Sequence, residues 1–263
     1  MIVSFKDAAN SSQNVPILFV PGAMSGAWIW ENNFASFFRS QGYKVHTMSF
    51  SGHGSSAAKR LRLSFSNYVD ECVAAMSSCD APPIVIAHSL GGLVALHAAT
   101  KIETHSLVLL SPVPAFGVLG SMASLAKKSP ISVAKFVSAA CYSGITKLGT
   151  PPLGIYSDTC HPEAAKTVTS QLQSESIPVL IRLLAPPALQ KEKLDPEKIL
   201  FIAAKGDLII PYLEVIKSAR HIGSEAIVYD GLSHTYQVER SWEDIAKDIT
   251  RWLHNRAPIQ QTY

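Results

Sequence analysis

The sequence predicts an α/β protein with a doubly wound, mostly parallel sheet and an inserted helical cap. Short strand-like runs alternate with helical patterns, and most of these runs are continuously apolar, as in strands that helices cover on both faces. The expected strands are residues 17–20, 44–50, 84–87, 106–110, 199–203 and 226–229. Repeated strand, helix and strand units are joined by right-handed crossovers, which build a doubly wound sheet.

Length and composition fit a globular protein with a sizeable core. The chain has 263 residues, of which 47% are hydrophobic, and its formal net charge is +3. One or two domains fit this length, and a single α/β domain of this size is common. Because no block of five like charges occurs, we expect no nucleic-acid partner. The charged fraction of 16% is low against the usual ~25%.

Helical spacing of large apolar residues predicts the helices near both ends of the chain. Phe34, Phe37 and Phe38 would share one face of an early helix. Residues 242–253 carry Trp, Ile, Ala and Leu at the same spacing, which predicts a final amphipathic helix. Each of these apolar faces would pack against the sheet.

The alternation of strands and helices stops over residues 112–195, which carry helical patterns and paired prolines but no clear strand. Strand-like runs resume at residue 199, so this segment is expected to be an insertion between two strands of one sheet. The predicted domains are therefore an α/β core of residues 1–111 and 196–263 and a helical cap of residues 112–195. A separate accessory domain or irregular packing helices are the alternative.

The sequence shows no pattern typical of a signal peptide, a membrane span or a paired-cysteine site. The N-terminus lacks a basic region followed by an apolar run and a small-residue cleavage site, so we expect a cytoplasmic protein. Residues 106–126 are uncharged, but their prolines and glycines argue against an integral membrane span. Cys72, Cys79, Cys141 and Cys160 form no CxxC pair and have no metal-like spacing, so we expect free thiols and no metal ion. The oligomeric state stays open.

The strongest local motif is IVIAHSLGGLVAL, residues 84–96, in which an apolar strand runs directly into an apolar helix. Ser89 lies at the turn between them. A sharp turn of this kind needs small residues two positions before and after the serine, and Ala87 and Gly91 supply them. Ser89 is therefore the predicted nucleophile, and the alternative is a serine that only caps the helix.

A serine hydroxyl is a weak nucleophile that needs an adjacent base, which a third group must orient. The order nucleophile, acid, histidine is expected for a serine at such a turn. Asp207 follows the strand-like run at residues 199–203, and His234 lies in the loop after the next predicted strand. We predict that Asp207 orients His234 and that His234 accepts the proton of Ser89.

Other residues compete for these roles. Asp230 could be the acid, although its place beside a glycine is more typical of a turn residue. The strand ending at residue 110 could carry the acid, but Ser111 follows it. His88 and His97 lie in or beside buried elements and are interpreted as packing residues. His53, in a Gly-rich turn, is interpreted as part of the loop architecture near the site, with a catalytic role as the alternative.

The reaction also needs donors for the negative charge on the former carbonyl oxygen, because each lost donor costs a factor of about 10²–10³ in rate. The backbone NH of Leu90, at the start of the helix, is one expected donor. The NH of Ala23, in a glycine-containing loop after an early strand, is the second. Met24, Ser25 and Trp28 would then line the substrate pocket, although a Trp at this spacing packs a helix equally often.

Five motifs, in this order, carry a family resemblance: VPGAMSGAWIW, SFSGHGSS, AHSLGG, AAKGDLIIP and DGLSHTYQVE. The chain resembles the α/β-hydrolase superfamily, in the capped subgroup of carboxylesterases, plant-type methyl esterases, hydroxynitrile lyases and cofactor-free haloperoxidases. The resemblance implies Ser89 as nucleophile, Asp207 as acid and His234 as base, with the Ala23 and Leu90 amides as the oxyanion hole. It also implies that no cofactor is needed. Dehalogenase chemistry is not expected, because those relatives carry an Asp in place of Ser89.

Two positions depart from the family's pattern. Pro21 stands where a His is usual before the glycine of the oxyanion loop, which bears on the geometry of that loop. Ala87 replaces the first glycine of the serine motif, and this change is mild because Ala is also small.

Together these residues predict a serine hydrolase that cleaves a carboxylic ester or thioester through an acyl-enzyme on Ser89. Two alternatives stay open. The same triad could act as a general base in lyase, cyclase or cofactor-free oxygen chemistry, or the chain could be a ligand receptor without catalysis.

The distribution of charge predicts the character of the substrate. Residues 106–160 contain five charged residues in 55, against 38 in the other 208. The first half of the predicted cap would therefore present an apolar wall to Ser89. We expect a small, largely hydrophobic ester or thioester as the substrate.

Overall fold

The computed structural model describes residues 1–6, 13–55, 63–141 and 154–256. Its centre is a seven-stranded sheet in the order β1-β3-β2-β4-β5-β6-β7, in which only β1 runs antiparallel to its neighbour. The strands are β1 (Ile2–Lys6), β2 (Ile17–Val20), β3 (Val45–Ser49), β4 (Ile84–His88), β5 (Ser106–Leu110), β6 (Ile199–Ala204) and β7 (Glu225–Tyr229). The predicted doubly wound, mostly parallel sheet is confirmed.

All six predicted strands are present, and β2 and β5 have the predicted bounds. The sequence does not predict β1. This strand lies at the edge of the sheet and pairs only with β3, from Ile2 opposite Ser49 to Lys6 opposite Val45. A five-residue edge strand with one charged residue lacks the continuous apolar run that marks the buried strands.

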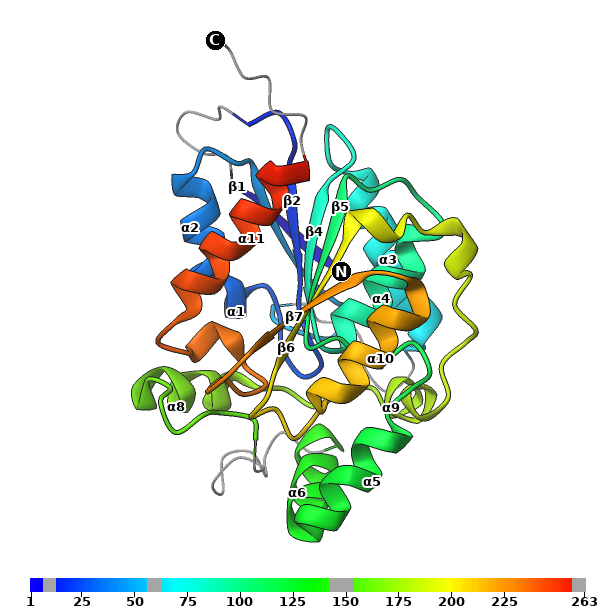
Figure 1. The fold of residues 1–263 in the computed structure, drawn as a ribbon, viewed down its shortest axis with the longest axis vertical. Coiled ribbons are helices and arrows are strands. Elements are labelled where there is room, and N and C mark those ends of the chain that lie inside the picture. The colour runs from blue at the N-terminus through cyan, green and yellow to red at the C-terminus, as the bar shows by residue number, and fades with distance from the viewer. Residues whose placement is uncertain (7–12, 56–62, 142–153, 257–263) are drawn as a thin grey trace.

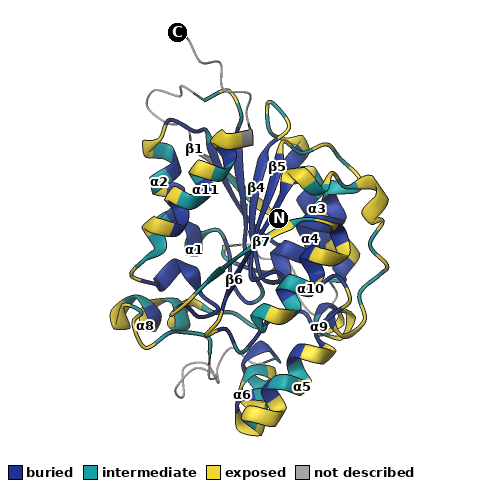
Figure 2. Cartoon of the chain, viewed as in Figure 1, coloured by how far each residue is buried: buried dark blue, intermediate teal, exposed yellow. Residues whose placement is uncertain are grey.

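Helices cover both faces of the sheet (Figure 1). The helices of the core are α1 (Trp28–Glu31), α2 (Phe34–Ser40), α3 (Phe65–Ser77), α4 (Leu90–Ala99), α10 (Tyr212–Ile222) and α11 (Trp242–Arg256). Residues of α1, α2 and α11 form one apolar cluster with Ile17 and Phe19 of β2, and residues of α3, α4 and α10 form the other with Leu18 and Val20. The alternation along β2 thus supplies both halves of the core, which Figure 2 shows as buried.

The described part of residues 112–195 is helical and contains no strand. Its helices are α5 (Leu119–Lys128), α6 (Pro130–Cys141), α8 (Pro162–Gln171) and α9 (Ile177–Leu184), followed by the short 3₁₀ turn η2 (Lys191–Lys193); a second 3₁₀ turn, η3 (Pro196–Lys198), then leads into β6. We call residues 112–195 the insertion. Its helices lie beyond one end of the sheet, whereas α11 ends near the opposite end (Figure 1). The division into two domains stays a prediction.

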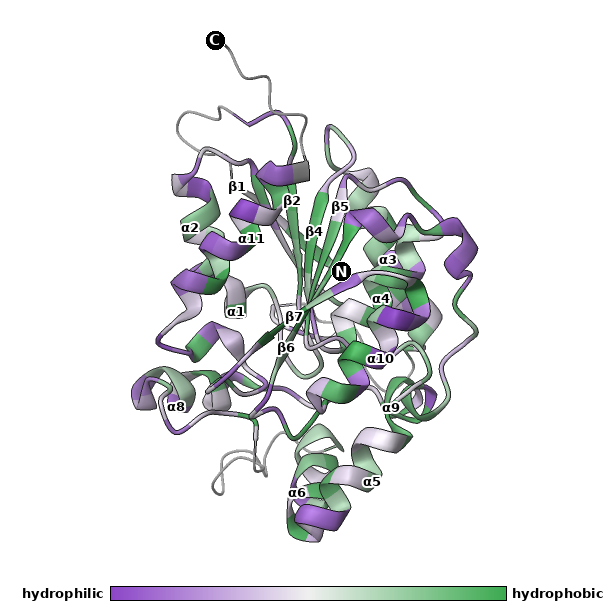
Figure 3. Cartoon of the chain, in the orientation of Figure 1, coloured by the Kyte–Doolittle hydropathy of each residue, from purple (hydrophilic) through white to green (hydrophobic). Residues whose placement is uncertain are grey.

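Hydropathy separates the sheet from the outer helices. The strands are predominantly hydrophobic, whereas α8 and α11 carry hydrophilic residues (Figure 3). No helix in the described ranges combines the length and the apolar character needed to cross a membrane. All four cysteines are free thiols, as predicted.

Truncating a central core side chain should destabilise the fold strongly. Leu109, in β5, is 0% exposed, so Leu109→Ala removes buried apolar contacts and should lower the free energy of unfolding by about 2–5 kcal/mol. Leu119→Ala is the control, because Leu119 is 60% exposed on α5, and it should cost less than about 0.5 kcal/mol. Equilibrium urea denaturation measures both, and equal losses would contradict the assigned core.

Candidate active site

Ser89 lies in a strained turn between β4 and α4. Its backbone has φ 53° and ψ −119°, a conformation that costs of order 1–3 kcal/mol in a residue other than glycine. Hydrogen bonds on both sides hold this turn. The Ser89 NH donates to Leu110 O at 3.0 Å, and Ser89 O accepts from Gly92 N at 3.0 Å and from Val113 N at 2.9 Å. The turn is therefore fixed by β5 and the residues after it.

Small residues let the loop after β2 lie against this turn. A Cβ atom on Gly91 would be 2.3 Å from Pro21 O, and one on Gly22 would be 2.8 Å from His88 Nδ1 and 3.1 Å from Ser89 Cβ. Neither position therefore has room for a side chain. The group that Pro21 presents to Gly91 is its carbonyl oxygen, which every residue type carries, so this contact does not depend on the His that is usual there.

His234 lies within hydrogen-bond distance of both Ser89 and Asp207. His234 Nε2 is 3.0 Å from Ser89 Oγ, and His234 Nδ1 is 2.7 Å from Asp207 Oδ2. The other oxygen, Asp207 Oδ1, accepts from Ile209 N at 2.9 Å and Ile210 N at 2.8 Å. Asp207 is 1% exposed, so these bonds replace water and hold the carboxylate in one orientation. The fold thus brings together the three side chains that the sequence singles out.

His88 supports His234 from within the sheet. Its Nε2 lies 2.9 Å from His234 O, and the two ring centroids are 4.8 Å apart. Burial, together with the nearby His234, lowers the pKa of His88 to about 3. The ring is therefore neutral, and the short distance to a carbonyl oxygen assigns its proton to Nε2. The sequence indicates only a packing role, because no local pattern links residues 146 positions apart.

The competing residues lie outside this hydrogen-bonded set. Asp230 is exposed and forms an ion pair with Lys205 at 2.7 Å. Ser111 is buried, and its Oγ lies 2.9 Å from Tyr236 OH. His97 lies in α4, where burial lowers its pKa, as expected of a packing residue. Across the described part of the chain, no group of three or more His, Cys, Asp or Glu side chains could hold a metal ion.

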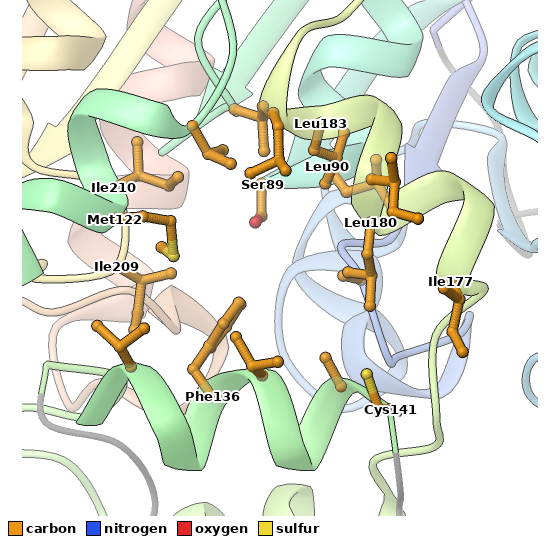
Figure 4. Close-up of a pocket in the computed structure, with 18 residues that line it drawn as sticks. Ser89, Leu90, Met122, Phe136, Cys141, Ile177, Leu180, Leu183, Ile209 and Ile210 are labelled. Carbon is orange, nitrogen blue, oxygen red and sulfur yellow. The ribbon is translucent and has the colours of Figure 1, made fainter. Parts of the chain in front are cut away.

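A cavity of about 290 Å³ opens at Ser89. Ala23 and Leu90, the predicted oxyanion donors, line it together with Ser89. Leu90 is the first residue of α4, where the amide has no partner within the helix. The Ser89 hydroxyl points into the space between α6 and α9 (Figure 4). Apolar side chains from these helices and from neighbouring segments form the walls, among them Met122, Phe136, Leu180, Leu183, Ile209 and Ile210.

The other three predicted pocket residues do not line this cavity, and this is a correction. Met24 packs against the end of α6, the hydroxyl of Ser25 donates to Gly22 O at 3.0 Å, and Trp28 lines a separate groove beside α8. Met24 has φ 64°, and its side chain is buried against Ala139 and Ala140 of α6, behind the cavity wall that Ala140 helps to form. Residues of the insertion line the cavity where the sequence predicts these three side chains.

A buried carboxylate of the insertion contacts the same loop. Glu175 is 2% exposed, and its Oε2 accepts from Met24 N at 3.0 Å and lies 3.3 Å from His53 Nε2. Its Oε1 accepts from Tyr68 OH at 2.6 Å and from Ser176 N at 2.8 Å. Burial alone would raise the pKa of Glu175, but His53, Tyr68 and Met24 together lower it below its ordinary value. His53 thus lies in the loop architecture near the site, and no sequence motif indicates Glu175.

Comparison with known proteins identifies the family. The model of the alpha/beta hydrolase family matches residues 17–248. The chain therefore belongs to this family of hydrolytic enzymes, which confirms the class that its motifs resemble. A search of curated protein sequences finds no match.

Solved structures share the fold at low sequence identity. An esterase from Thermogutta terrifontis has a TM-score of 0.73 at 18% identity and covers 96% of this chain and 93% of its own. A monoacylglycerol lipase from Paleococcus ferrophilus has a TM-score of 0.68 at 16% identity, over 97% of this chain and 99% of its own. An esterase from Exiguobacterium antarcticum has a TM-score of 0.69 at 14% identity, over 96% and 94%.

The neutral His88 should make stability depend on pH. Its pKa is about 3 in the folded protein and 6.5 when unperturbed, so below pH ~6.5 the unfolded chain binds a proton that the folded chain does not. The contribution of neutral His88 to the free energy of unfolding is therefore complete above pH ~6.5. It is lost as the pH falls toward ~3, at up to about 1.4 kcal/mol per pH unit.

The variant His88→Gln tests this dependence, because it keeps a donor for His234 O and removes the titrating group. Its free energy of unfolding in urea should fall less than that of the wild type between pH ~7 and pH ~4. Parallel curves for the two proteins would show that His88 does not carry the effect.

Proposed function

We propose that this protein is a serine hydrolase that cleaves a largely hydrophobic carboxylic ester or thioester through an acyl-enzyme on Ser89. The observation that carries the proposal is the Asp207–His234–Ser89 geometry, with distances of 2.7 Å and 3.0 Å, at the mouth of an apolar cavity. Membership of the alpha/beta hydrolase family supports it, and so does the likeness of fold to two esterases and a lipase.

Acylation begins when Ser89 Oγ attacks the carbonyl carbon of the substrate and His234 Nε2 takes the hydroxyl proton. Asp207 holds His234 in the tautomer with its proton on Nδ1 and stabilises the imidazolium that forms. The carboxylate suits this role because two backbone amides fix Oδ1 and leave Oδ2 for the imidazole.

The tetrahedral intermediate places a negative charge on the former carbonyl oxygen. The NH groups of Ala23 and Leu90 are the proposed donors to this oxygen, and both residues line the cavity beside Ser89. Collapse of the intermediate breaks the bond to the alcohol or thiol, which leaves with the proton from His234. A water molecule then attacks the carbonyl carbon of the acyl-enzyme while His234 Nε2 takes its proton. The second intermediate collapses to the free carboxylic acid, and His234 returns the proton to Ser89 Oγ.

The cavity walls support a hydrophobic acyl group. Among the described residues that line it, only Ser89 and Cys141 have a side chain that can donate a hydrogen bond, and none of these residues is charged. A charged acyl group would lose its hydration there without gaining an ion partner. In this proposal residues 112–195 act as a cap, whose helices α5, α6 and α9 supply most of the wall.

The triad assignment predicts that substitution of two aspartates, Asp207 and Asp230, has sharply different effects on catalysis. Ser89→Ala should abolish hydrolysis of p-nitrophenyl esters, and Asp207→Asn should lower kcat by about 10³–10⁴-fold because it destroys the orientation of His234. Asp230→Asn is the matched control, because Asp230 is exposed on the same loop as His234 and pairs with Lys205. Its kcat should equal that of the wild type.

Mass spectrometry of the quenched reaction should find the acyl group on the peptide that contains Ser89. Full turnover by Asp207→Asn would rule out the proposed acid. Turnover by the wild type without an acyl adduct would favour general-base chemistry on the same residues. Binding without turnover would favour the ligand receptor.

The apolar cavity predicts the choice of acyl group. We expect kcat/KM for p-nitrophenyl heptanoate to exceed that for p-nitrophenyl hydrogen adipate, an acyl group of similar length with a terminal carboxylate, by at least about 100-fold. Initial rates at several substrate concentrations, corrected for spontaneous hydrolysis, measure the ratio. A preference for the adipate ester would contradict the assignment of this cavity to the acyl group.

A further inference from the structure

Both backbone hydrogen-bonding groups of Met24 are held by the insertion. Met24 N donates to Glu175 Oε2 at 3.0 Å, and Met24 O accepts from Gln173 N at 2.8 Å. Met24 directly follows Ala23, whose NH is the proposed oxyanion donor, and its φ of 64° is unfavourable for a residue with a side chain. The conformation of the loop at Ala23 therefore depends on partners that the core does not supply.

The surroundings of Glu175 are built for a carboxylate. Its oxygens face the Met24 and Ser176 NH groups, the Tyr68 hydroxyl and the His53 ring, and a carboxylate has only acceptors to offer. These groups come from four separate places: the loop after β2, the insertion itself, α3 and the turn after β3. Such a set joins the insertion to the core at one buried point.

The segment around Glu175 is fastened to the core on a second side. Gln173 Oε1 accepts from Gly54 N at 2.7 Å, and Gln173 Nε2 donates to Gly54 O at 3.3 Å. Ser176 Oγ donates to Leu63 O at 2.5 Å. We call residues 173–176 the strap. It leads directly into α9, which begins at residue 177 and supplies Leu180 and Leu183 to the wall of the cavity.

We propose that Glu175 is a positioning residue that holds Met24, and through it the Ala23 NH, in the geometry of the oxyanion hole. The inference rests on the proposed function. Because the strap continues into α9, the wall that receives the acyl group and the loop that receives the oxyanion are joined by one short segment. The oxyanion hole is complete only when the insertion is seated on the core.

The substitution Glu175→Gln isolates this role with little change in volume. A glutamine amide has one acceptor oxygen and one NH₂ donor. In either orientation of the amide, the NH₂ group faces a backbone NH, that of Met24 or that of Ser176, so one hydrogen bond is replaced by two opposed donors. Ser176→Ala is the matched control, because it removes a neighbouring bond between the strap and the core and leaves all four contacts of Glu175 in place.

Two kinds of measurement test the proposal. Steady-state kinetics with p-nitrophenyl heptanoate should show that Glu175→Gln lowers kcat at least about tenfold, toward the ~10²–10³-fold of a fully lost donor, with KM within about twofold. Affinity for a heptyl trifluoromethyl ketone, which forms a tetrahedral adduct with an oxyanion, should fall by the same factor as kcat/KM. Ser176→Ala should leave both unchanged.

Hydrogen exchange supplies a readout that does not depend on turnover. Peptides covering residues 20–28 should exchange at least about tenfold faster in Glu175→Gln than in the wild type, whereas peptides covering residues 84–92 should not change. Unchanged exchange of the loop, or an unchanged kcat, would overturn the proposal. So would a loss of kcat that Ser176→Ala reproduces, since that would reflect loosening of the insertion in general.

Failure of the proposed function would look different. A wild type that neither hydrolyses esters nor reacts with a fluorophosphonate at Ser89 would reject the hydrolase, and the exchange data would still decide whether Glu175 holds the loop. If Glu175→Gln does not fold, Tyr68→Phe serves instead, because it removes one of the two donors to Oε1 and so loosens the carboxylate that holds Met24 N. Tyr68→Phe should lower kcat and speed hydrogen exchange of residues 20–28, as Glu175→Gln does, but by smaller factors. If both values in Tyr68→Phe equal those of the wild type, the proposal is overturned.

Discussion

The close approach of two backbone turns is the constraint on which the rest of the site depends. The turn at Ser89 and the loop after β2 are so near that a Cβ atom on Gly91 would lie 2.3 Å from Pro21 O, and one on Gly22 would lie 3.1 Å from Ser89 Cβ. Only glycine fits at both places. This contact brings Ala23 to the same cavity as Ser89 and Leu90, although the two segments are far apart in the chain.

The parallel sheet brings the other groups to this point. The strands β2, β4, β5, β6 and β7 lie side by side in this order and are all parallel. The segments after β2, β4, β6 and β7 therefore all leave the sheet at the same edge, where the carboxyl ends of the strands lie. Ser89, Asp207 and His234 each follow one of these strands closely. His88, the last residue of β4, adds a link by contacting the backbone of His234 from inside the sheet. The position of His234 is therefore tied to the same strand that leads into Ser89.

The sequence predicts those parts of the molecule that depend on local pattern. Strand-like runs, most of them continuously apolar, mark six strands, and the small residues around Ser89 mark its turn, because both are consequences of neighbours in the chain. The edge strand β1 lacks such a run. The pocket walls could not be predicted in detail, because helices of the insertion, far from Ser89 in the sequence, supply most of them, and Met24 is buried against α6 instead. Glu175 stands in no motif, and its role depends on contacts with residues as distant as 151 positions.

The scarcity of charge in the first half of the insertion acquires a second meaning beside Glu175. Apolar helix faces can cover this edge of the sheet by the hydrophobic effect alone, but apolar contacts are not directional and do not fix the angle of a backbone amide. A buried carboxylate surrounded by donors does fix it, since each of its bonds has a preferred distance and direction and its removal would leave buried donors unpaired. The insertion thus combines two kinds of interaction. In the proposed function its apolar helices receive the acyl group, and one ionised side chain sets the position of the loop beside them.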